Sequence, residues 1–287
     1  METKAKVLRT LRKSLAPVAQ ECAIYESEQI LQYLLNCSRS DLYFKNFPLI
    51  DDTVERRIRT IVTRRISGEP LAYILGSVFF YSMEISVNRH VLIPRPETEV
   101  LVETILKTEP QSAESFVDFG TGSGAILAVL CKERPLWHGL GMDKSFDAIK
   151  TARLNCKSNN VTFLCSDNFS SINQSVQQKY GFDFIVSNPP YISGDEMKSL
   201  DASVTTFEPR SALYGGNDGM DFYRLLAKEG KNILKSGGRL YCEMGSDQGE
   251  TIRNIFQNAC WNNINIIFDL AGRQRVISAC HNGLLYK

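Results

Sequence analysis

The stretch FVDFGTGSGAI, residues 116 to 126, decides the fold expected for this 287-residue chain. It begins as an apolar strand with Asp118 near its end, and it then places Gly120, Gly122 and Gly124 before an apolar helical run. Glycines at such a turn let the backbone bend sharply and let a ligand lie against it, while the next helix offers unpaired N–H groups. The stretch therefore predicts a strand, a ligand-binding loop and a helix in succession.

Strand and helix patterns alternate from residue 97 onward. Such alternation is typical of an α/β, Rossmann-like architecture, in which helices cover both faces of a mostly parallel sheet. Segment 263–281 instead predicts two strands joined across Ala271 and Gly272, which would make one edge of a seven-stranded sheet antiparallel. We expect strands over 115–119, 138–142, 161–165, 182–187 and 239–243, helices over 97–107, 125–133, 145–157, 219–234 and 248–257, and a loop or short helix over 170–180.

The N-terminal part of the chain has a different pattern, that of a small helical bundle. Leu8, Leu11 and Leu15 have helical spacing, and two aspartates at 51–52 open a helix that stops near Gly68. A short β-hairpin around residue 82 follows. The predicted domains are a helical substrate-recognition domain over 1–75, a β-hairpin linker over 76–96 and a cofactor-binding catalytic domain over 97–287.

Composition excludes several classes of protein. The chain has 33 basic and 32 acidic residues, so its net charge of +1 indicates no general attraction to nucleic acid or membranes. Eight scattered cysteines without a C-x-x-C pair, with only three histidines, predict no metal site and no disulfide framework. A signal-peptide pattern and a membrane-spanning apolar run are both missing. We therefore expect a soluble, cytoplasmic, monomeric protein with reduced thiols.

The glycine loop by its spacing fits two kinds of nucleoside cofactor. Gly120-x-Gly122-x-x-Ala125 satisfies the dinucleotide fingerprint, and Asp143 lies where that fold places its ribose-binding carboxylate. The same residues suit S-adenosylmethionine, and the series from Asp118 through Gly124 favours this second cofactor. The loop alone therefore predicts a nucleoside cofactor without choosing between the two.

The tetrapeptide Asn-Pro-Pro-Tyr at 188–191 makes that choice. It follows an apolar strand, and its two prolines lack backbone donors and fix two φ angles. The side-chain oxygen of Asn188 and the carbonyl of Pro189 can accept both N–H bonds of a planar –NH2 group, and Tyr191 can lie against its face. A hydride-transfer enzyme has no use for such a clamp. We therefore predict methylation of a planar nitrogen with S-adenosylmethionine.

Together, the glycine loop, Asp143 and the Asn-Pro-Pro-Tyr motif resemble the class I methyltransferases. Within these, GEPLAYILG (68–76), LIPRPETEVLVE (92–103), FEPRSALYGGNDGMDFYR (207–224) and AGRQRV (271–276) resemble the HemK/PrmC family of peptide chain release factor N5-glutamine methyltransferases. The resemblance implies a substrate that the residues alone do not supply, namely the glutamine of the Gly-Gly-Gln loop of class 1 release factors. It also implies a role in translation termination.

The expected site follows from the motifs and the resemblance together. Asn188 should orient the substrate amide, and methyl transfer should depend on positioning and preorganised electrostatics rather than on a strong base. By resemblance, Asn168 packs against adenine, although many relatives have an aromatic residue there; Asp167 beside it fits a helix cap equally well. The expected residues are Asn188, Pro189 and Tyr191 for catalysis, these three with Pro190 and Arg95 for substrate binding, and Gly120, Thr121, Gly122, Ser123, Gly124, Asp143, Asn168 and Asn188 for the cofactor.

Several alternatives remain open from sequence. Arg95 between two prolines is either a wall of the active site or part of a rigid connector. The same Asn-Pro-Pro-Tyr clamp serves nucleic-acid N6-adenine or exocyclic-amine methyltransferases, but residues 1–86 hold 12 basic and 10 acidic residues, a weak nucleic-acid footprint. A third alternative is an inactive cofactor-fold protein that serves as a binding module. The intact glycine loop and clamp argue against it.

Overall fold

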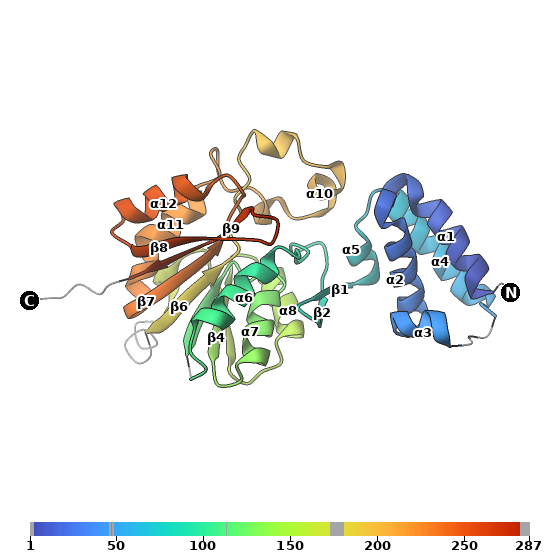
Figure 1. The fold of residues 1–287 in the computed structure, drawn as a ribbon, viewed down its shortest axis with the longest axis horizontal. Coiled ribbons are helices and arrows are strands. Elements are labelled where there is room, and N and C mark those ends of the chain that lie inside the picture. The colour runs from blue at the N-terminus through green and yellow to red at the C-terminus, as the bar shows by residue number, and fades with distance from the viewer. Residues whose placement is uncertain (1–2, 46, 48, 113, 173–180, 282–287) are drawn as a thin grey trace, which may run out of the picture. The chain divides into compact units, whose positions relative to one another are not determined.

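A computed structural model describes residues 3–45, 47, 49–112, 114–172 and 181–281 of the chain. It contains two compact units, of which the first is Met1–Ser77 with Asp201–Phe207 and the second is Val78–Leu200 with Glu208–Lys287 (Figure 1). Each unit has its own buried apolar core. Most of the segment predicted as a loop or short helix, residues 173–180, lies outside the described residues. Among the described residues, no helix combines the length and apolarity needed to cross a membrane.

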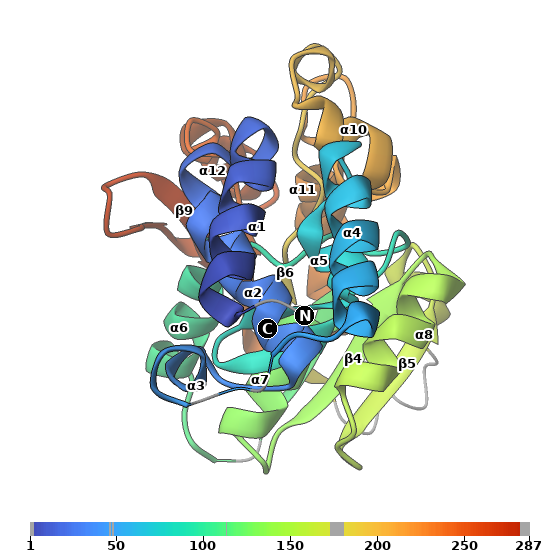
Figure 2. The same ribbon diagram turned by 90° about the vertical axis from the view of Figure 1, so that its right-hand side faces the viewer.

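The first unit is helical, as the periodicity predicts. Figure 2 shows α1 beside α2 and α4, whose apolar faces bury residues such as Leu11, Leu15 and Ile30. The side chain of Asp51 caps α4 by accepting from the Val54 N–H group at 2.8 Å, which explains why that helix begins where it does. The helices are α1 (Lys4–Ala19), α2 (Ala23–Leu35), α3 (Arg39–Phe44), α4 (Asp52–Ile66), α5 (Leu71–Leu75) and α10 (Ala202–Phe207), with a short 3-10 turn at Gln20–Cys22.

One member of this unit comes from far along the chain. Helix α10 is grouped with the first unit, although about 125 residues separate it in sequence from the rest of that unit, which ends at Ser77. A Cβ atom added at Gly68, which has a φ of +93°, would stand 3.7 Å from the Phe207 ring. A glycine after α4 therefore lets the chain turn beside the end of α10, a contact that no local pattern could predict.

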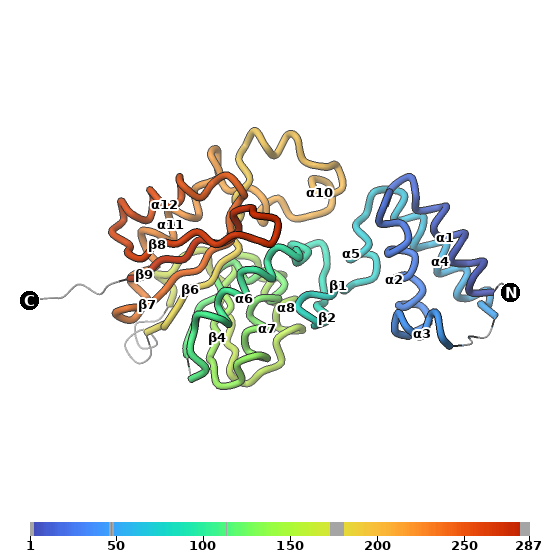
Figure 3. Tube along the Cα trace, in the orientation of Figure 1, coloured from blue at the N-terminus to red at the C-terminus, as the bar shows by residue number. Residues whose placement is uncertain are grey.

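The second unit contains the predicted seven-stranded sheet. Its strand order is β5-β4-β3-β6-β7-β9-β8, parallel from β5 to β7 and antiparallel where β9 pairs with β7 and β8. Figure 3 traces this edge, where β8 and β9 run side by side. The strands are β3 (Ser115–Phe119), β4 (His138–Asp143), β5 (Val161–Cys165), β6 (Phe182–Ser187), β7 (Leu234–Glu243), β8 (Asn262–Phe268) and β9 (Gln274–Cys280), and a separate hairpin joins β1 (Ser77–Phe80) to β2 (Met83–Ser86).

Helices cover the sheet, so its central strands are largely apolar. Phe116 of β3 stacks on Phe184 of β6 with ring centroids 5.0 Å apart, and Trp137 meets Phe184 edge-on at 5.4 Å. These contacts fix β3 beside β6, which is the pairing that brings the ends of the two strands together at the site. The helices are α6 (Thr98–Thr108), α7 (Ala125–Glu133), α8 (Phe146–Asn155), α11 (Asp221–Glu229) and α12 (Gly249–Asn258). All but α11 are close to their predicted bounds. The helix predicted to reach residue 234 ends at Glu229, and a 3-10 turn at Gly230–Ile233 leads into β7, which begins at Leu234 rather than at residue 239.

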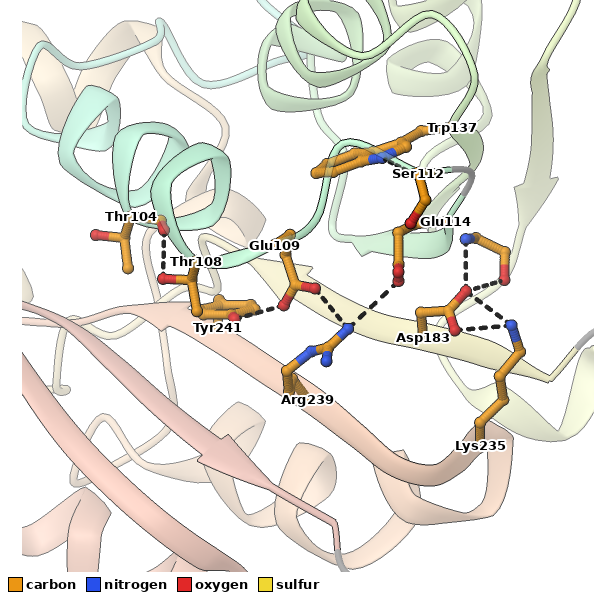
Figure 4. A network of polar contacts seen from close by, with 11 residues as sticks. Thr104, Thr108, Glu109, Ser112, Glu114, Trp137, Asp183, Lys235, Arg239 and Tyr241 are labelled. Atoms are coloured by element: carbon orange, nitrogen blue, oxygen red, sulfur yellow. Dashed lines mark hydrogen bonds and ion pairs between the residues drawn. The ribbon is translucent and has the colours of Figure 1, made fainter.

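A buried polar network ties the segment after α6 to β7 (Figure 4). The Tyr241 hydroxyl donates to Glu109 at 2.5 Å, and the Arg239 guanidinium pairs with Glu109 at 2.5 Å and with Glu114 at 3.3 Å. Burial raises the pKa of the Glu109 carboxyl, while Tyr241 and Arg239 oppose that rise. The charge of a buried carboxylate is costly unless its partners are in place.

Glu109→Ala is therefore expected to lower the free energy of unfolding by about 2 kcal/mol, since it leaves the buried Tyr241 hydroxyl without its acceptor and leaves Arg239 with Glu114 alone. Urea denaturation followed by circular dichroism measures the change. Glu103→Ala is the matched control, because Glu103 pairs with Lys107 on the exposed face of α6 and should change stability by no more than about 0.5 kcal/mol. Equal effects of the two substitutions would contradict the assigned role of Glu109.

Candidate active site

A cavity lies at the carboxyl ends of β3, β4 and β6 in the second unit. Apolar side chains and a few polar groups line it together, as is typical of small-molecule and cofactor sites. Open parallel sheets bind ligands at this edge, beside the point where the strand order reverses. From the predicted set, the wall includes Gly120, Thr121, Gly122, Ser123, Asp143, Asn188 and Pro190.

The glycine loop turns from β3 into α7 with left-handed backbone at three positions. Gly120, Gly122 and Gly124 have φ angles of +75°, +55° and +77°. A Cβ at Gly120 would meet nothing within 4 Å, whereas one at Gly124 would stand 2.9 Å from the Ala152 Cβ atom. Gly120 therefore keeps the floor of the cavity open to a ligand, and Gly124 allows α7 to pack against α8.

Asp118 lies beneath this loop and is fully buried. It accepts a hydrogen bond from the Thr121 hydroxyl at 2.6 Å, while its second oxygen, Oδ1, has no hydrogen-bond partner among the described residues. Burial raises the pKa of the Asp118 carboxyl to about 7. The bond to Thr121 shows that Asp118 supports the loop from below, and it is Thr121, not Asp118, that reaches the cavity.

Asp143 is the last residue of β4, the strand beside β3, and it lines the cavity. One carboxylate oxygen accepts from the Gly122 N–H at 2.9 Å and the other from the Ser145 N–H at 2.8 Å. Burial raises the pKa of this carboxyl, and these two backbone donors oppose the rise. Each oxygen keeps a further lone pair, so Asp143 can brace the loop and still accept from two hydroxyl groups of a ligand.

Asn168 is placed differently from the expectation that it packs against adenine. Its side-chain oxygen accepts from the Ser170 N–H at 3.1 Å and caps a 3-10 turn, and its Nδ2 donates to Asp167 at 2.7 Å. The cavity wall takes Ser166 and Asp167 from this loop instead. The Asn168 amide is therefore bonded to the neighbouring backbone. Asn168, and not Asp167, caps the helical turn here.

Asn188 lies directly after β6 and faces the same cavity. Its Nδ2 atom donates to the Thr98 hydroxyl oxygen at 3.1 Å. Thr98 is the first residue of α6 and is buried. Sequence reasoning did not single out Thr98 within the LIPRPETEVLVE stretch, because this contact joins residues 90 positions apart in the chain.

The rest of the tetrapeptide forms a rigid turn behind the cavity. Pro189 is buried, and Tyr191 packs against the core of the unit, where burial raises the pKa of its phenol to about 12. A Cβ at Gly215 would stand 2.5 Å from the Pro190 carbonyl oxygen, and one at Gly219 would stand 2.4 Å from that of Tyr191. The glycines of the YGGNDG run (214–219) therefore leave room for the turn at 188–191. In the sequence, these glycines were the signal that another backbone segment passes close by.

Arg95 holds a neighbouring loop together. Its guanidinium pairs at 2.5 Å with Glu208, whose side chain is 2% exposed, and the other Glu208 oxygen accepts from the Ile93 N–H at 3.4 Å. This contact favours the connector role of Arg95 over direct lining of the cavity, although its neighbour Pro94 does line it. Other wall residues that sequence reasoning did not single out are His90, Lys144, Ser145 and Phe222.

Two family models match the chain, one in each part. The PrmC N-terminal domain matches residues 6–76, and the Methyltransferase small domain matches residues 96–207. Among solved structures, a methyltransferase from Pyrococcus furiosus covers 79% of this chain and 98% of its own at a TM-score of 0.52 and 18% identity. That likeness confirms the class I methyltransferase fold.

Curated relatives are more similar to this chain in sequence than the Pyrococcus furiosus protein is. The release factor glutamine methyltransferase of Thermodesulfovibrio yellowstonii is 36% identical over 260 residues, which span 88% of this chain and 91% of the relative. The protein of the same name from Nitratidesulfovibrio vulgaris is 35% identical over 278 residues, spanning 96% and 94%. Because the match extends over both units and nearly the full length of each relative, the chain belongs to the release factor glutamine methyltransferase family.

Proposed function

We propose that this protein transfers a methyl group from S-adenosylmethionine to the side-chain amide nitrogen of the glutamine in the Gly-Gly-Gln motif of class 1 peptide chain release factors. One observation carries the proposal. Asn188 lines the same cavity as the glycine loop and Asp143. A substrate amide and a nucleoside cofactor can therefore meet there. The names of the relatives supply the substrate.

The cavity fits S-adenosylmethionine by the open backbone and the hydrogen-bond acceptors that it offers. The open space above Gly120 gives a ligand access to the backbone, and Asp143 keeps lone pairs for ribose hydroxyls after bracing Gly122 and Ser145. Gly120 to Ser123 would hold the methionine and ribose portion. The cofactor, when bound, supplies an electrophilic methyl group on a positively charged sulfur.

The protein's own part in the reaction is to hold a poor nucleophile in place. An amide nitrogen reacts slowly because its lone pair is shared with the carbonyl group. Asn188 Oδ1 and the Pro189 carbonyl would accept the two N–H bonds of the glutamine, which fixes the nitrogen in the cavity and polarises it. Rigid prolines at 189 and 190 keep both acceptors aimed. Tyr191, held in the core, would stiffen this turn from behind.

Charge in the first unit gives little support to a nucleic-acid substrate. Arg64 of α4 forms two hydrogen bonds to Glu69 at 2.7 and 2.5 Å, and Arg65 pairs with Glu26 at 2.9 Å. Helix α4 carries five arginines, Arg56, Arg57, Arg59, Arg64 and Arg65, and part of this charge is thus neutralised within the unit. A phosphate-binding surface needs basic side chains that remain available to the backbone. We assign this unit to recognition of the release factor.

A methylation assay with three acceptors tests the proposal. The protein is incubated with labelled S-adenosylmethionine and, separately, a purified class 1 release factor, its Gln→Ala variant in the Gly-Gly-Gln loop, and duplex DNA. Label is expected on the intact release factor alone. Label on DNA would instead support the exocyclic-amine alternative, and label that persists on the Gln→Ala variant would refute glutamine as the acceptor.

A further inference from the structure

The Asn-Pro-Pro-Tyr turn needs support from outside itself, because its two prolines have no N–H groups to donate. Before the turn, the buried Ser187 hydroxyl donates to the Phe119 carbonyl at 2.7 Å. After the turn, the Ile192 N–H donates to the Leu213 carbonyl at 3.0 Å. Between these two anchors, the backbone of the turn is held by a side chain from a distant part of the chain.

That side chain is Gln248, in the loop between β7 and α12. Its Nε2 atom donates to the Tyr191 carbonyl at 2.9 Å, and its Oε1 atom accepts from the Gly245 N–H at 3.0 Å. One end of the amide thus faces a backbone acceptor and the other end a backbone donor. Only one orientation of an amide satisfies both, so the –NH2 end of Gln248 must lie at Tyr191.

The Gln248 side chain is not used by the helix that follows it. Gln248 directly precedes α12, a position where polar side chains commonly cap a helix. Within the described part of the chain, its side chain makes no cap hydrogen bond. The amide instead bridges the loop after β7 and the turn after β6, two segments that 57 positions separate.

The AGRQRV motif (271–276) fixes the place from which Gln248 reaches the turn. Gln274 of β9 accepts from the Gly249 N–H at 3.0 Å through its Oε1 atom. Gly249 is the first residue of α12 and follows Gln248 directly. A Cβ atom at Gly249 would collide with Gln274 and would stand 2.8 Å from Ile266 Cδ1. Glycine therefore lets α12 begin close against β9, where Gln274 holds it.

We propose that Gln248 is a positioning residue, which holds the backbone of the Asn-Pro-Pro-Tyr turn so that Asn188 and the Pro189 carbonyl meet the substrate –NH2 group together. Gln274 supports Gln248 from β9. This inference rests on the proposed function, because the turn is the proposed substrate clamp. The prolines fix two φ angles of the turn, so a shift at the Tyr191 carbonyl is passed along the backbone to Asn188.

The first test replaces Gln248 by glutamate. Gln248→Glu keeps the size of the side chain and an acceptor for Gly245, but near pH 8 it is ionised and has no donor for Tyr191. We expect kcat for the release factor to fall by about 10- to 100-fold, the scale of a misplaced reacting group. The Kd of S-adenosylmethionine by calorimetry should stay within about 2-fold of wild type, because the turn and not the glycine loop is disturbed.

The matched control is Gln257→Glu, since Gln257 is an exposed glutamine of the same helix. It should methylate at the wild-type rate, and circular dichroism shows that both variants are folded. A kcat of Gln248→Glu within about 2-fold of wild type would overturn the proposal. A loss of the same size in Gln257→Glu would overturn it as well.

The same substitution at Gln274 has a different expected result. Gln274 serves Gly249 as an acceptor, which Gln274→Glu retains and Gln274→Leu removes. Gln274→Glu should therefore keep most of the activity, and Gln274→Leu should lower kcat by about 5-fold, the equivalent of one neutral hydrogen bond. Equal losses in Gln248→Glu and Gln274→Glu would mean that charge, rather than the contact with Tyr191, causes the effect.

A double-mutant cycle shows whether Gln248 acts through the clamp. In an Asn188→Ala background, Gln248→Glu should cause little further loss of kcat, because the amide that the turn positions is gone. Losses that multiply would indicate a general structural effect and would contradict the positioning role.

One readout does not depend on methylation. The Ile192 amide proton, next to the turn, should exchange with solvent faster in Gln248→Glu than in wild type, and at the wild-type rate in Gln257→Glu. Nuclear magnetic resonance in deuterated water measures this exchange. If wild type methylates no release factor but the difference is present, the substrate assignment fails and the positioning role stands. If the exchange is the same in all three proteins, the positioning role fails.

Discussion

Asn188→Ala is expected to lower the rate of release factor methylation by at least about 100-fold, on the scale of losing one preorganised polar contact in an active site. The substitution removes the amide that faces the cavity and ends the contact with Thr98. Binding of S-adenosylmethionine should largely survive, because the glycine loop and Asp143 are braced by their own hydrogen bonds. The loss should therefore appear in kcat rather than in cofactor affinity.

Initial rates with a purified release factor and calorimetric titration with the cofactor measure the two effects separately. Asn254→Ala is the matched control, because Asn254 is an exposed asparagine of α12 in the same unit. It should methylate at the wild-type rate. Near-normal turnover of Asn188→Ala would remove this residue from the mechanism, and equal loss in both variants would indicate a nonspecific effect.

Asp143→Ala should weaken binding of S-adenosylmethionine by at least about 100-fold. Two effects add: the ribose loses its carboxylate acceptor, and the Gly122 and Ser145 N–H groups lose the acceptor that holds the loop in shape. Hydrogen bonds to a charged group are each worth about 1.5–3 kcal/mol, and every 1.4 kcal/mol changes Kd by about tenfold. The loss of such a group therefore accounts for a change of this size.

The measurement is again the cofactor Kd by calorimetry, with circular dichroism to show that the variant is folded. Asp195→Ala serves as the control, since the Asp195 side chain is 94% exposed and pairs only locally with Lys198. Its Kd should match that of wild type. The Kd of Asp143→Asn should lie between that of wild type and that of Asp143→Ala, because the amide retains one acceptor oxygen. Wild-type affinity in Asp143→Ala would refute its assignment to the cofactor site.

Much of the second unit follows from local sequence. The bounds of β3, β5, β6 and α7 match those predicted, because each is a short apolar run that ends at glycine, proline or polar residues. The glycine loop, Asp143 and Asn188 were recognisable because a ligand-binding turn needs glycines, and because a carboxylate and an amide each follow a strand. In a parallel sheet, such residues necessarily meet at one edge.

Sequence was less informative about short polar side chains that have several possible hydrogen-bond partners. Asn168 was expected at the cofactor, but its amide caps a 3-10 turn through Ser170. Asparagine bonds readily to nearby backbone N–H groups, and one chain does not show whether it will do so. Helices α3 and α5 are only 6 and 5 residues long, too short for their period to stand out individually within the predicted bundle.

Local sequence patterns predicted the strands, the glycine loop, and the residues that stand at the ends of the strands. Which of these side chains touch came from the tertiary structure: Asn188 meets Thr98 across 90 positions of the chain. The physical reason is that periodicity and turn chemistry act over a few residues. The orientation of a single amide depends instead on strand order and on the partners that this order delivers to a buried edge.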